Sequence, residues 1–482
     1  MKLQELLVDV ATIKTIGTVD REVGQIQFDS RKLSAGDIFI AQKGTQVDGH
    51  RFIPTAEETG VAAIVCEDLP KERKDGITYL QVESASKALG LMACAFYGHP
   101  SRELKLVGVT GTNGKTTTVT LLYDLFRRLA YSTGMLSTVV NKINEEEITA
   151  THTTGDALQI NQLLRKMADA GVQYCFMEAS SHAIHQHRIA GLDFDGGVFT
   201  NITHDHLDYH QTFKDYIFAK KMLFDQLPAH AFALVNADDK RGPVMLQNCK
   251  AKHYTYALRG LSDFPAKIVS NGFHGLEIEV EGQPVFFRLI GAFNAYNLMV
   301  AYVVASLFEI PKEDVLLELS ALTGAPGRFE LVPNALRKVA IVDYAHTPDA
   351  LENVLKTIQE IRQQGQQMIT VVGCGGDRDK TKRPKMAHIA AKLSDKVILT
   401  ADNPRSEDPQ VILQEMAEGL EITQRAKVLQ ILDRKEAIRT ANMLAEQKDI
   451  ILVAGKGHET YQEIQGVRHH FDDREVIREI LV

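Results

Sequence analysis

Residues 104–117 read Leu104-Lys-Leu-Val-Gly-Val-Thr-Gly-Thr-Asn-Gly-Lys-Thr-Thr117. The apolar run from Leu104 to Val109 predicts a buried strand, and a glycine-containing loop follows it. Beyond the loop, helical spacing puts four apolar residues on one face, namely Val119, Leu122, Phe126 and Leu129. A strand that leads through a glycine loop into a helix is the opening unit of a nucleotide-binding α/β domain.

The loop itself has the chemistry of a phosphate-binding site. Successive backbone N–H groups and a helix N-terminus can cradle phosphate oxygens. We expect Lys115 to reach the β- and γ-phosphates of ATP and the Thr116 hydroxyl to hold Mg²⁺. Val109 stands where the strict template has its first glycine, so this is a variant loop, and a plain strand–turn–helix corner is the alternative. The candidate nucleotide contacts are Gly111, Thr112, Asn113, Gly114, Lys115, Thr116 and Thr117.

The rest of the chain repeats this alternation of strands and helices. A length of 482 residues suggests about three domains. Chain-breaking residues mark two joints, at Tyr97–Ser101 and Thr323–Arg328. We therefore predict an α/β protein of three domains, over residues 1–100, 101–330 and 331–482. The central domain is expected to be a P-loop-type ATPase domain with a mainly parallel sheet, and the C-terminal domain to be Rossmann-like.

Composition limits the classes of partner. Lys and Arg total 54 against 62 Asp and Glu, a net charge of −8, which gives no general attraction to nucleic acid or anionic membrane. The N-terminus is too polar for a signal peptide, and the longest apolar stretch is about half a membrane span. The five cysteines are scattered and form no Cys-x-x-Cys pair. These features predict a cytoplasmic protein with neither a disulfide framework nor a zinc site.

In the C-terminal third, unusual residues follow four predicted strands. The strands are Val339–Val342, Ile369–Val372, Val397–Thr400 and Ile450–Val453. The segments that follow them are Asp343, Gly373–Arg378, Asp402–Arg405 and Gly455–Glu459. Because open α/β sheets bind ligands at the carboxyl ends of their strands, we expect a second binding region there.

Two acidic stretches could supply metal ligands near the phosphate loop. Glu178 ends a predicted strand at Gln173–Met177 and could hold Mg²⁺, although a solvated acid at a strand end is the alternative. Residues 201–210 are dense in His and Asp, but their spacing matches no standard zinc pattern, so a polar surface loop remains the alternative there.

Taken in order, the motifs resemble those of the Mur ligases, ATP-dependent enzymes that lengthen the peptide stem of the bacterial cell-wall precursor. The resemblance covers essentially the whole chain. The motifs are Gly111–Thr116, Glu178–His182, Asn201–Asp208, Phe293–Asn297, Pro326–Arg328 and Asp343–Pro348.

Three further stretches are similar to those of the family members that add the third stem residue in its meso-diaminopimelate form. They are Asp29-Ser-Arg31, Gly373–Lys380 and Asp402-Asn-Pro-Arg405. The resemblance implies ATP-driven activation of the D-Glu carboxylate of UDP-N-acetylmuramoyl-L-Ala-D-Glu as an acyl phosphate, followed by attack of the diaminopimelate amine.

The resemblance also implies which residues do the chemistry. Lys115, Lys220 and His206 would be catalytic, and two Mg²⁺ sites would draw on Thr116, Glu178, His206 and Lys220. Lys220 matches the family lysine that CO₂ carbamylates, which turns a cation into an anionic oxygen ligand. Its neighbour Lys221 is expected to be an ordinary solvated lysine.

Binding residues carried over from the family fall into three groups. The remaining ATP contacts would be Asn294, Asn297, Arg328, Asp343 and His346, although Asn294 and Asn297 could equally cap a helix starting near Asn297. The UDP-substrate contacts would be Ser30, Thr45, Gln46, Thr153, Thr154, Ser180, Gln186 and Arg188. The amino-acid contacts would be Arg378, Asp402, Asn403, Pro404, Arg405, Gly455 and Glu459.

Arg405 can form two parallel hydrogen bonds to a carboxylate, and its alternative is a surface pair with Glu407 or Asp408. The expected partners are these small molecules alone, and the expected state is a monomer. The rival functions are an L-lysine-adding ligase, a folylpolyglutamate synthase and a P-loop regulator without ligase activity.

Overall fold

The structure is a computed structural model that describes residues 1–44, 47–150, 153–203, 207–333, 336 and 338–481. The chain divides into two compact units, Met1–Phe264 and Pro265–Val482. Among the helices within these described ranges, none is both long enough and apolar enough to cross a membrane.

The first unit begins with a small five-stranded sheet in the order β1-β5-β4-β3-β2. Its strands are β1 (Thr12–Ile16), β2 (Ile26–Gln27), β3 (Ile38–Ala41), β4 (Ala63–Cys66) and β5 (Thr78–Val82). Only β1 is antiparallel to its neighbour. One face packs against α1 (Leu3–Leu6) and α3 (Ala85–Phe96), and the other against α2 (Ile53–Thr59). Both faces are therefore covered, as a parallel sheet requires.

The same unit continues into a larger sheet in the order β13-β12-β11-β6-β10-β7-β8-β9. The strands from β13 to β7 are parallel, and β8 and β9 add an antiparallel hairpin. The strands are β6 (Lys105–Thr110), β7 (Thr133–Leu136), β8 (Val140–Ile143), β9 (Glu146–Thr149), β10 (Tyr174–Glu178), β11 (Gly196–Phe199), β12 (Phe232–Asn236) and β13 (Lys252–Ala257).

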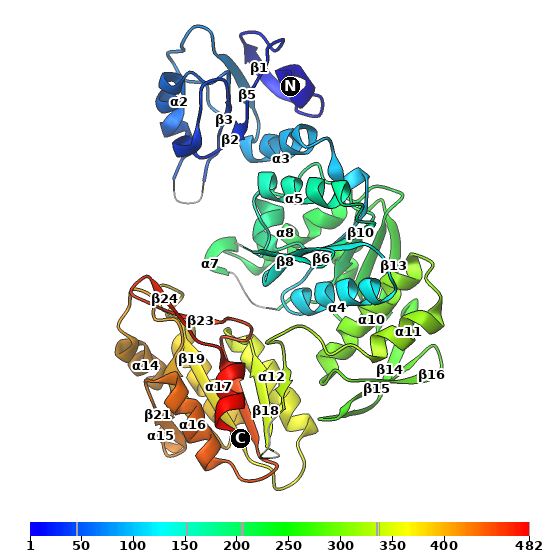
Figure 1. Cartoon of the computed structure of the whole chain (residues 1–482), viewed down its shortest axis with the longest axis vertical. Helices are drawn as coiled ribbons and strands as arrows, with labels where there is room; N and C mark the ends of the chain where they lie inside the picture. Colours follow the sequence, from blue (N-terminus) through cyan, green and yellow to red (C-terminus); the bar gives the residue numbers. More distant parts are fainter. Residues whose placement is uncertain (45–46, 151–152, 204–206, 334–335, 337, 482) are drawn as a thin grey trace. The chain divides into compact units, whose positions relative to one another are not determined.

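Helices cover both faces of this larger sheet. Figure 1 shows α4 (Lys115–Arg128) along one face, with α5 (Ala157–Asp169) and α8 (Phe213–Asp225) along the other. Alternate residues of β10 point to opposite faces, so Phe176 packs edge-to-face against Phe126 of α4 while Cys175 and Met177 join the α5 and α8 core. Shorter helices complete the unit, namely α6 (Ser181–His185), α7 (Leu207–His210) and α9 (Gly242–Leu246).

The second unit opens with the strands β14 (Phe264–Gly272), β15 (Gly275–Val280) and β16 (Gln283–Phe287), which pair in antiparallel fashion. Two helices follow, α10 (Ala292–Leu307) and α11 (Lys312–Ser320). This antiparallel segment is not part of the parallel pattern expected from the sequence.

The rest of the second unit is a six-stranded sheet in the order β17-β18-β22-β19-β20-β21. The strands are β17 (Glu330–Val332), β18 (Val339–Asp343), β19 (Met368–Cys374), β20 (Lys396–Ala401), β21 (Val428–Gln430) and β22 (Ile450–Ala454). All are parallel except the edge strand β17. One face packs against α12 (Pro348–Ile361), α13 (Lys382–Leu393) and α14 (Pro409–Ala417), and the other against α16 (Arg434–Leu444) and α17 (Asp473–Ile480).

The second unit also contains α15 (Ile422–Arg425) and the hairpin β23 (Tyr461–Ile464) with β24 (Val467–His470). Each strand predicted in the C-terminal third is present within a residue or two of its expected bounds. The α/β class with a mainly parallel central sheet and a Rossmann-like C-terminal sheet is confirmed.

Candidate active site

The phosphate loop joins β6 to α4 as the sequence predicted. β6 ends at Thr110 and α4 begins at Lys115. Gly114 has φ +88°, a left-handed conformation that favours glycine. A Cβ on Gly111 would lie 1.9 Å from Oγ1 of Thr200, so only glycine fits that position. Both glycines of the loop are thus required by its geometry.

The exit of β11 holds the loop in shape. Thr112 N–H donates to the Asn201 carbonyl at 2.8 Å, and Asn113 N–H donates to Oδ1 of Asn201 at 3.0 Å. The Thr200 hydroxyl donates to the Asn113 carbonyl at 2.7 Å. Because β11 pairs with β6, the residue order Thr200-Asn201 falls directly beside the loop.

Two lysines converge on one carbonyl of this loop. Lys115 Nζ donates to the carbonyls of Gly111 and Thr112, both at 2.8 Å. Lys220 Nζ donates to the same Gly111 carbonyl at 2.7 Å and lies 4.5 Å from the centre of the Tyr216 ring. Lys220 is 1% exposed. Two ammonium groups on one carbonyl repel each other, and burial away from water strengthens that repulsion.

Lys221 differs from the expectation of a solvated lysine. Its side chain is buried, pairs with Asp225 and donates to the Gln247 carbonyl at 2.6 Å. Helix α8 contacts both α6 and α9, so two successive lysines are both covered.

Glu178 is a buried acid beside the phosphate loop. It ends β10 opposite Val109 of β6 and is 1% exposed, so it is not the solvated acid of the alternative interpretation. Its carboxylate accepts from Thr138 N–H at 2.8 Å and from the Thr138 hydroxyl at 3.2 Å. Thr116, also buried, lies in the first turn of α4.

The metal ligands expected from the resemblance lie only in part among the described residues. Within the described residues, no group of three or more His, Cys, Asp or Glu side chains that could hold a metal ion is found. His206, which the resemblance assigns to a metal, lies outside the described residues.

A cluster of polar side chains lies beside the backbone carbonyl of Glu178. The Thr154 hydroxyl donates to the Glu178 carbonyl at 2.8 Å and accepts from Ser180 N–H at 3.2 Å. Arg188 Nη1 donates to the Thr154 carbonyl at 2.9 Å, and its Nη2 donates to Oε1 of Gln186 at 2.6 Å. Four expected substrate residues therefore lie together.

Burial lowers the pKa of the Arg188 guanidinium below its usual value. Tyr209, which the sequence analysis missed, accepts from Gln186 Nε2 at 3.0 Å. Thr153 is half-buried next to Thr154.

The other expected uridine-end residues belong to the N-terminal sheet. Ser30 starts a short 3₁₀ turn, which Asp29 caps by accepting from Arg31 N–H at 3.1 Å. Thr45 and Gln46 lie outside the described residues.

In the second unit, Asn294 and Asn297 are not helix caps. Helix α10 begins at Ala292, and Gly291 is its N-cap without a side-chain hydrogen bond. Asn294 Nδ2 donates to the Ile290 carbonyl at 2.8 Å, and Asn297 Nδ2 donates to Oδ1 of Asn294 at 3.0 Å. Both side chains are buried in the first turns of the helix.

Asp343 ends β18 and is nearly enclosed. Its carboxylate accepts from the N–H groups of Phe329 at 2.6 Å and Ala345 at 2.8 Å. Burial raises its pKa to about 6, although the nearby Arg328 guanidinium opposes this change.

Three side chains pack against the ring of Tyr344. The Arg328 guanidinium lies 4.5 Å from its centre, and the rings of His346 and His458 lie at 4.5 and 4.8 Å. Burial lowers the pKa of His458 to about 3. The expected nucleotide residues Arg328, Asp343 and His346 therefore lie together, beside the loop after β22.

The loop that carries Gly327 and the loop after β22 touch through their backbones. A Cβ on Gly327 would lie 2.1 Å from the amide nitrogen of His458, and a Cβ on Gly457 would lie 2.6 Å from the Gly327 carbonyl oxygen. Neither glycine can gain a side chain without a backbone movement.

The loops after β19, β20 and β22 also come together. Asn403 Nδ2 donates to Oε2 of Glu459 at 2.7 Å, and Lys456 Nζ lies 3.1 Å from Oδ1 of Asn403 and 3.2 Å from the same Glu459 oxygen. A Cβ on Gly455, which has φ +115°, would lie 2.5 Å from Oδ2 of Asp402. Burial and the charge of Asp402 raise the pKa of Glu459, while Lys456 acts in the opposite direction.

Arg405 does not form the surface pair considered as its alternative. Its Nη1 donates to the Gly376 carbonyl at 2.6 Å, whereas Glu407 pairs with the fully buried Arg383 at 2.9 Å. Pro404 packs against the same loop, since a Cβ on Gly376 would lie 1.9 Å from its carbonyl oxygen. Arg378 is exposed in the loop after β19.

The sequence analysis missed Thr138, Tyr209 and Lys456. Only Lys456 carried a local signal, because it stands between two glycines in Gly455-Lys-Gly-His-Glu459 just after a strongly apolar strand.

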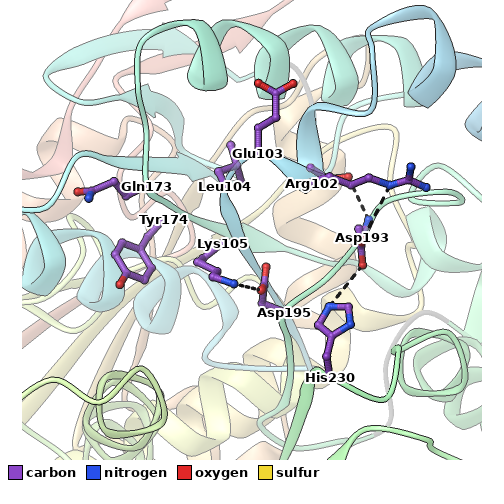
Figure 2. A pocket seen from close by; sticks show the side chains of 10 residues that line it. Arg102, Glu103, Leu104, Lys105, Gln173, Tyr174, Asp193, Asp195 and His230 are labelled. Atoms are coloured by element: carbon purple, nitrogen blue, oxygen red, sulfur yellow. Dashed lines mark hydrogen bonds and ion pairs between the residues drawn. The ribbon is translucent and has the colours of Figure 1, made fainter.

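A separate hollow of about 470 Å³ is lined by residues at the amino ends of β6 and β10 (Figure 2). The phosphate loop follows the opposite end of β6. Lys105 lies 2.8 Å from Asp195 and Arg102 lies 3.9 Å from Asp193, while Glu103 pairs with Arg165, which does not line the hollow. None of the predicted site residues is among the residues that line it.

A parallel sheet whose glycine loop presents a lysine at a helix start defines the class of phosphate-loop nucleotide-binding proteins. Three family models match successive parts of the chain. They are "Mur ligase family, catalytic domain" over residues 22–97, "Mur ligase middle domain" over 109–305 and "Mur ligase, glutamate ligase domain" over 327–457.

Full-length relatives agree with these models. The chain is 57% identical over 482 residues to the UDP-N-acetylmuramoyl-L-alanyl-D-glutamate–2,6-diaminopimelate ligase of Cytophaga hutchinsonii, covering 100% of this chain and 99% of that one. It is 53% identical over 480 residues to the protein of the same name from Phocaeicola vulgatus, with the same coverage. A solved structure under that name matches with a TM-score of 0.70 and 32% identity, covering 100% and 98% of the two chains. The chain belongs to the Mur ligase family.

Proposed function

We propose that this chain is an ATP-dependent ligase that adds meso-diaminopimelate to the D-Glu of UDP-N-acetylmuramoyl-L-Ala-D-Glu in peptidoglycan precursor synthesis. The observation that carries the proposal is the 57% identity over the whole chain to a protein named for this ligation. ATP gives its γ-phosphoryl group to the D-Glu carboxylate, which yields an acyl phosphate and ADP. The diaminopimelate amine then attacks the acyl carbon, the amide bond forms and phosphate leaves.

The phosphate loop is assigned to bind and orient the nucleotide. The N–H groups at the start of α4, from Gly114 to Thr117, would bind the phosphates, while those of Thr112 and Asn113 hold the loop to Asn201. Lys115 neutralises the charge that develops during transfer, and its resting bonds to two loop carbonyls keep its ammonium at the loop.

The residues beside the loop fit Mg²⁺. The buried Glu178 carboxylate, oriented by Thr138, and the Thr116 hydroxyl are the hard oxygen donors that this ion prefers. Mg²⁺, when bound, neutralises phosphate charge. We assign Thr116 and Glu178 to one Mg²⁺ site, and His206 and carbamylated Lys220 to the second.

Carbamylation of Lys220 by CO₂ is supported by its surroundings. As an ammonium, Lys220 shares the Gly111 carbonyl with Lys115. A carbamate keeps one N–H, which can still donate to Gly111, and its negative charge replaces repulsion of Lys115 by attraction. The buried position protects the modified side chain from water.

The remaining assignments concern binding. Asn294 and Asn297 would bind adenine, Asp343 the ribose hydroxyls, and Arg328 and His346 the nucleotide near them. Thr153, Thr154, Ser180, Gln186 and Arg188 would bind the UDP-substrate, with Ser30, Thr45 and Gln46 at its uridine end. The joined Thr154–Arg188 contacts support a single substrate surface in that cluster.

The incoming amino acid is assigned to the loops after β19, β20 and β22. Arg405 would bind the distal carboxylate of diaminopimelate, and Glu459 would face its distal ammonium. Arg378 and Gly455 would also contact this amino acid, with Asp402, Asn403 and Pro404 shaping the site. We further propose that residues 1–100, 101–330 and 331–482 serve as UDP-substrate, ATP and amino-acid domains. The chain is further proposed to be a monomer and to act in the cytoplasm.

The test is ADP release measured with purified protein. We expect release only when ATP, the UDP-dipeptide and an amino acid are all present, and with meso-diaminopimelate strongly preferred to L-lysine. ADP release without the UDP-dipeptide or the amino acid would indicate an NTPase or regulator instead, and equal use of lysine would remove the diaminopimelate assignment.

A further inference from the structure

Lys456 is a fully buried cation at the centre of the amino-acid loops. Its side chain is 0% exposed, in the loop that follows β22. Its Nζ lies 3.1 Å from Oδ1 of Asn403, 3.2 Å from Oε2 of Glu459 and 4.0 Å from Oδ1 of Asp402. A buried ammonium is tolerated only with such oxygen partners.

The contacts of Lys456 link strands that are not neighbours. Asp402 and Asn403 follow β20, Lys456 and Glu459 follow β22, and β19 lies between the two strands in the sheet. A Cβ on Gly373, at the end of β19, would lie 2.5 Å from the Thr400 carbonyl oxygen, so the end of β19 leaves no room there for a side chain. Lys456 therefore joins the β20 and β22 loops across the intervening strand.

Lys456 does not occupy all the carboxylate oxygens around it. Oε2 of Glu459 accepts from both Asn403 and Lys456, while the structure describes no hydrogen bond to Oε1 of Glu459 or to the Asp402 carboxylate oxygens. Two carboxylates and one ammonium leave one net negative charge. That charge matches one ammonium group on a ligand.

A second buried ion pair supports the end of β22. Arg434 and Asp473 are both 0% exposed, and their side chains pair through two hydrogen bonds of 2.8 Å each. Arg434 Nη2 also donates to the carbonyl of Ala454, two residues before Lys456, at 3.1 Å. The backbone that carries Lys456 is therefore held from behind.

We propose that Lys456 is a positioning and specificity-determining residue, which holds Asn403 and Glu459 in one arrangement and leaves a single net negative charge for the distal ammonium of the incoming amino acid. This inference rests on the proposed function. Arg405 selects the distal carboxylate, and the Lys456 group selects the ammonium beside it, so the site selects an amino acid whose far end is itself zwitterionic.

The experiment compares Lys456→Met with Lys427→Met. Lys427 is a half-buried lysine of the same unit that donates to the Ser394 carbonyl at 2.7 Å, away from the three loops. We expect Lys456→Met to raise the KM for diaminopimelate about tenfold or more, because the partners of a removed buried ion stay uncompensated. The KM values for ATP and the UDP-dipeptide should change less than threefold, and Lys427→Met should resemble the wild type in all three.

A pH profile separates this role from loose packing. The charged and titratable groups that face Glu459 are Asp402, Lys456, Arg434, Tyr344 and Tyr461. Lys456 opposes the rise in the pKa of Glu459, so its loss should move the acid limb of kcat/KM for diaminopimelate to higher pH. An unchanged limb, or an unchanged KM for diaminopimelate, would overturn the inference.

Wild-type turnover is measured first with all three substrates. If the wild type shows no diaminopimelate-dependent ADP release, the proposed function fails; if it does and Lys456→Met retains the normal KM, only this inference fails. Should Lys456→Met not fold, Lys456→Gln removes the charge but keeps a polar side chain toward Asn403 and Glu459. We expect Lys456→Gln to raise the KM for diaminopimelate as well, and an unchanged KM would contradict the inference.

Discussion

Replacement of Arg405 by alanine tests the choice of amino acid most directly. In the structure the Arg405 guanidinium is held by a hydrogen bond of 2.6 Å from Nη1 to the Gly376 carbonyl. Its backbone has φ +52°, and alanine keeps the Cβ, so the substitution changes the strain little. A carboxylate bound by two charge-assisted hydrogen bonds, at about 1.5–3 kcal/mol each, would gain about 3–6 kcal/mol. Arg405→Ala should therefore lower kcat/KM for diaminopimelate by about 10²–10⁴-fold.

The assay is steady-state ADP release with diaminopimelate or L-lysine as the acceptor. The KM values for ATP and the UDP-dipeptide should stay near those of the wild type, because Arg405 is assigned to neither. Arg439→Ala is the matched control, since Arg439 lies on α16 of the same unit and pairs with Glu436 at the surface. A wild type that uses L-lysine as well as diaminopimelate, or an Arg405→Ala variant that keeps the wild-type preference, would refute the reasoning.

Three further outcomes are expected. Lys115→Ala should lower turnover by about 10³-fold or more, because the transferring phosphate loses its cation. The control Lys166→Ala, on the exposed side of α5, should leave ADP release unchanged. Near-normal turnover of Lys115→Ala would remove the phosphate-loop assignment. Lys220→Ala should be nearly inactive, with partial recovery in Lys220→Glu. Lys221→Ala should mainly lower the melting temperature, because it removes a buried lysine that pairs with Asp225 and donates to the Gln247 carbonyl. Equal loss of turnover per folded molecule in the two alanine variants would contradict the choice of lysine. Asp343→Asn should gain stability relative to the wild type as pH rises from about 4 to 7, because burial raises the Asp343 pKa to about 6 and the wild type loses stability as this group ionises. Urea unfolding at several pH values measures that change, and a stability difference independent of pH would contradict it.

The strands that local sequence patterns predicted are present within a residue or two of their expected bounds, because each is a short apolar run between chain-breaking residues. The strands of the N-terminal sheet were not predicted. The strand expected at Gln173–Met177 is β10 at Tyr174–Glu178, displaced by one residue. The phosphate loop was predictable for the same reason, because its strand, glycines and helix start are contiguous. The hairpin of β8 and β9 was missed, since β8 is mostly half-buried, β9 is mostly exposed and neither has a strong apolar run.

Contacts between distant segments could not be predicted. Thr138 orients Glu178 only because β7 pairs with β10, and a single sequence does not state the strand order. Lys221 was expected in solvent, but α9 covers that side of α8. The alternative interpretation of Asn294 and Asn297 as helix caps was wrong, because α10 begins earlier, at Ala292.

The contact between Gly327 and Gly457 limits how the two loops can evolve. At each position a new side chain would collide with main-chain atoms of the other loop, at 2.1 Å from the His458 nitrogen or 2.6 Å from the Gly327 oxygen. Because these atoms belong to the main chain, a smaller side chain at a neighbouring position would not make room for a Cβ. No single compensating substitution is therefore available to either glycine. The two glycines therefore constrain each other, and a lineage that keeps this loop contact must keep both of them.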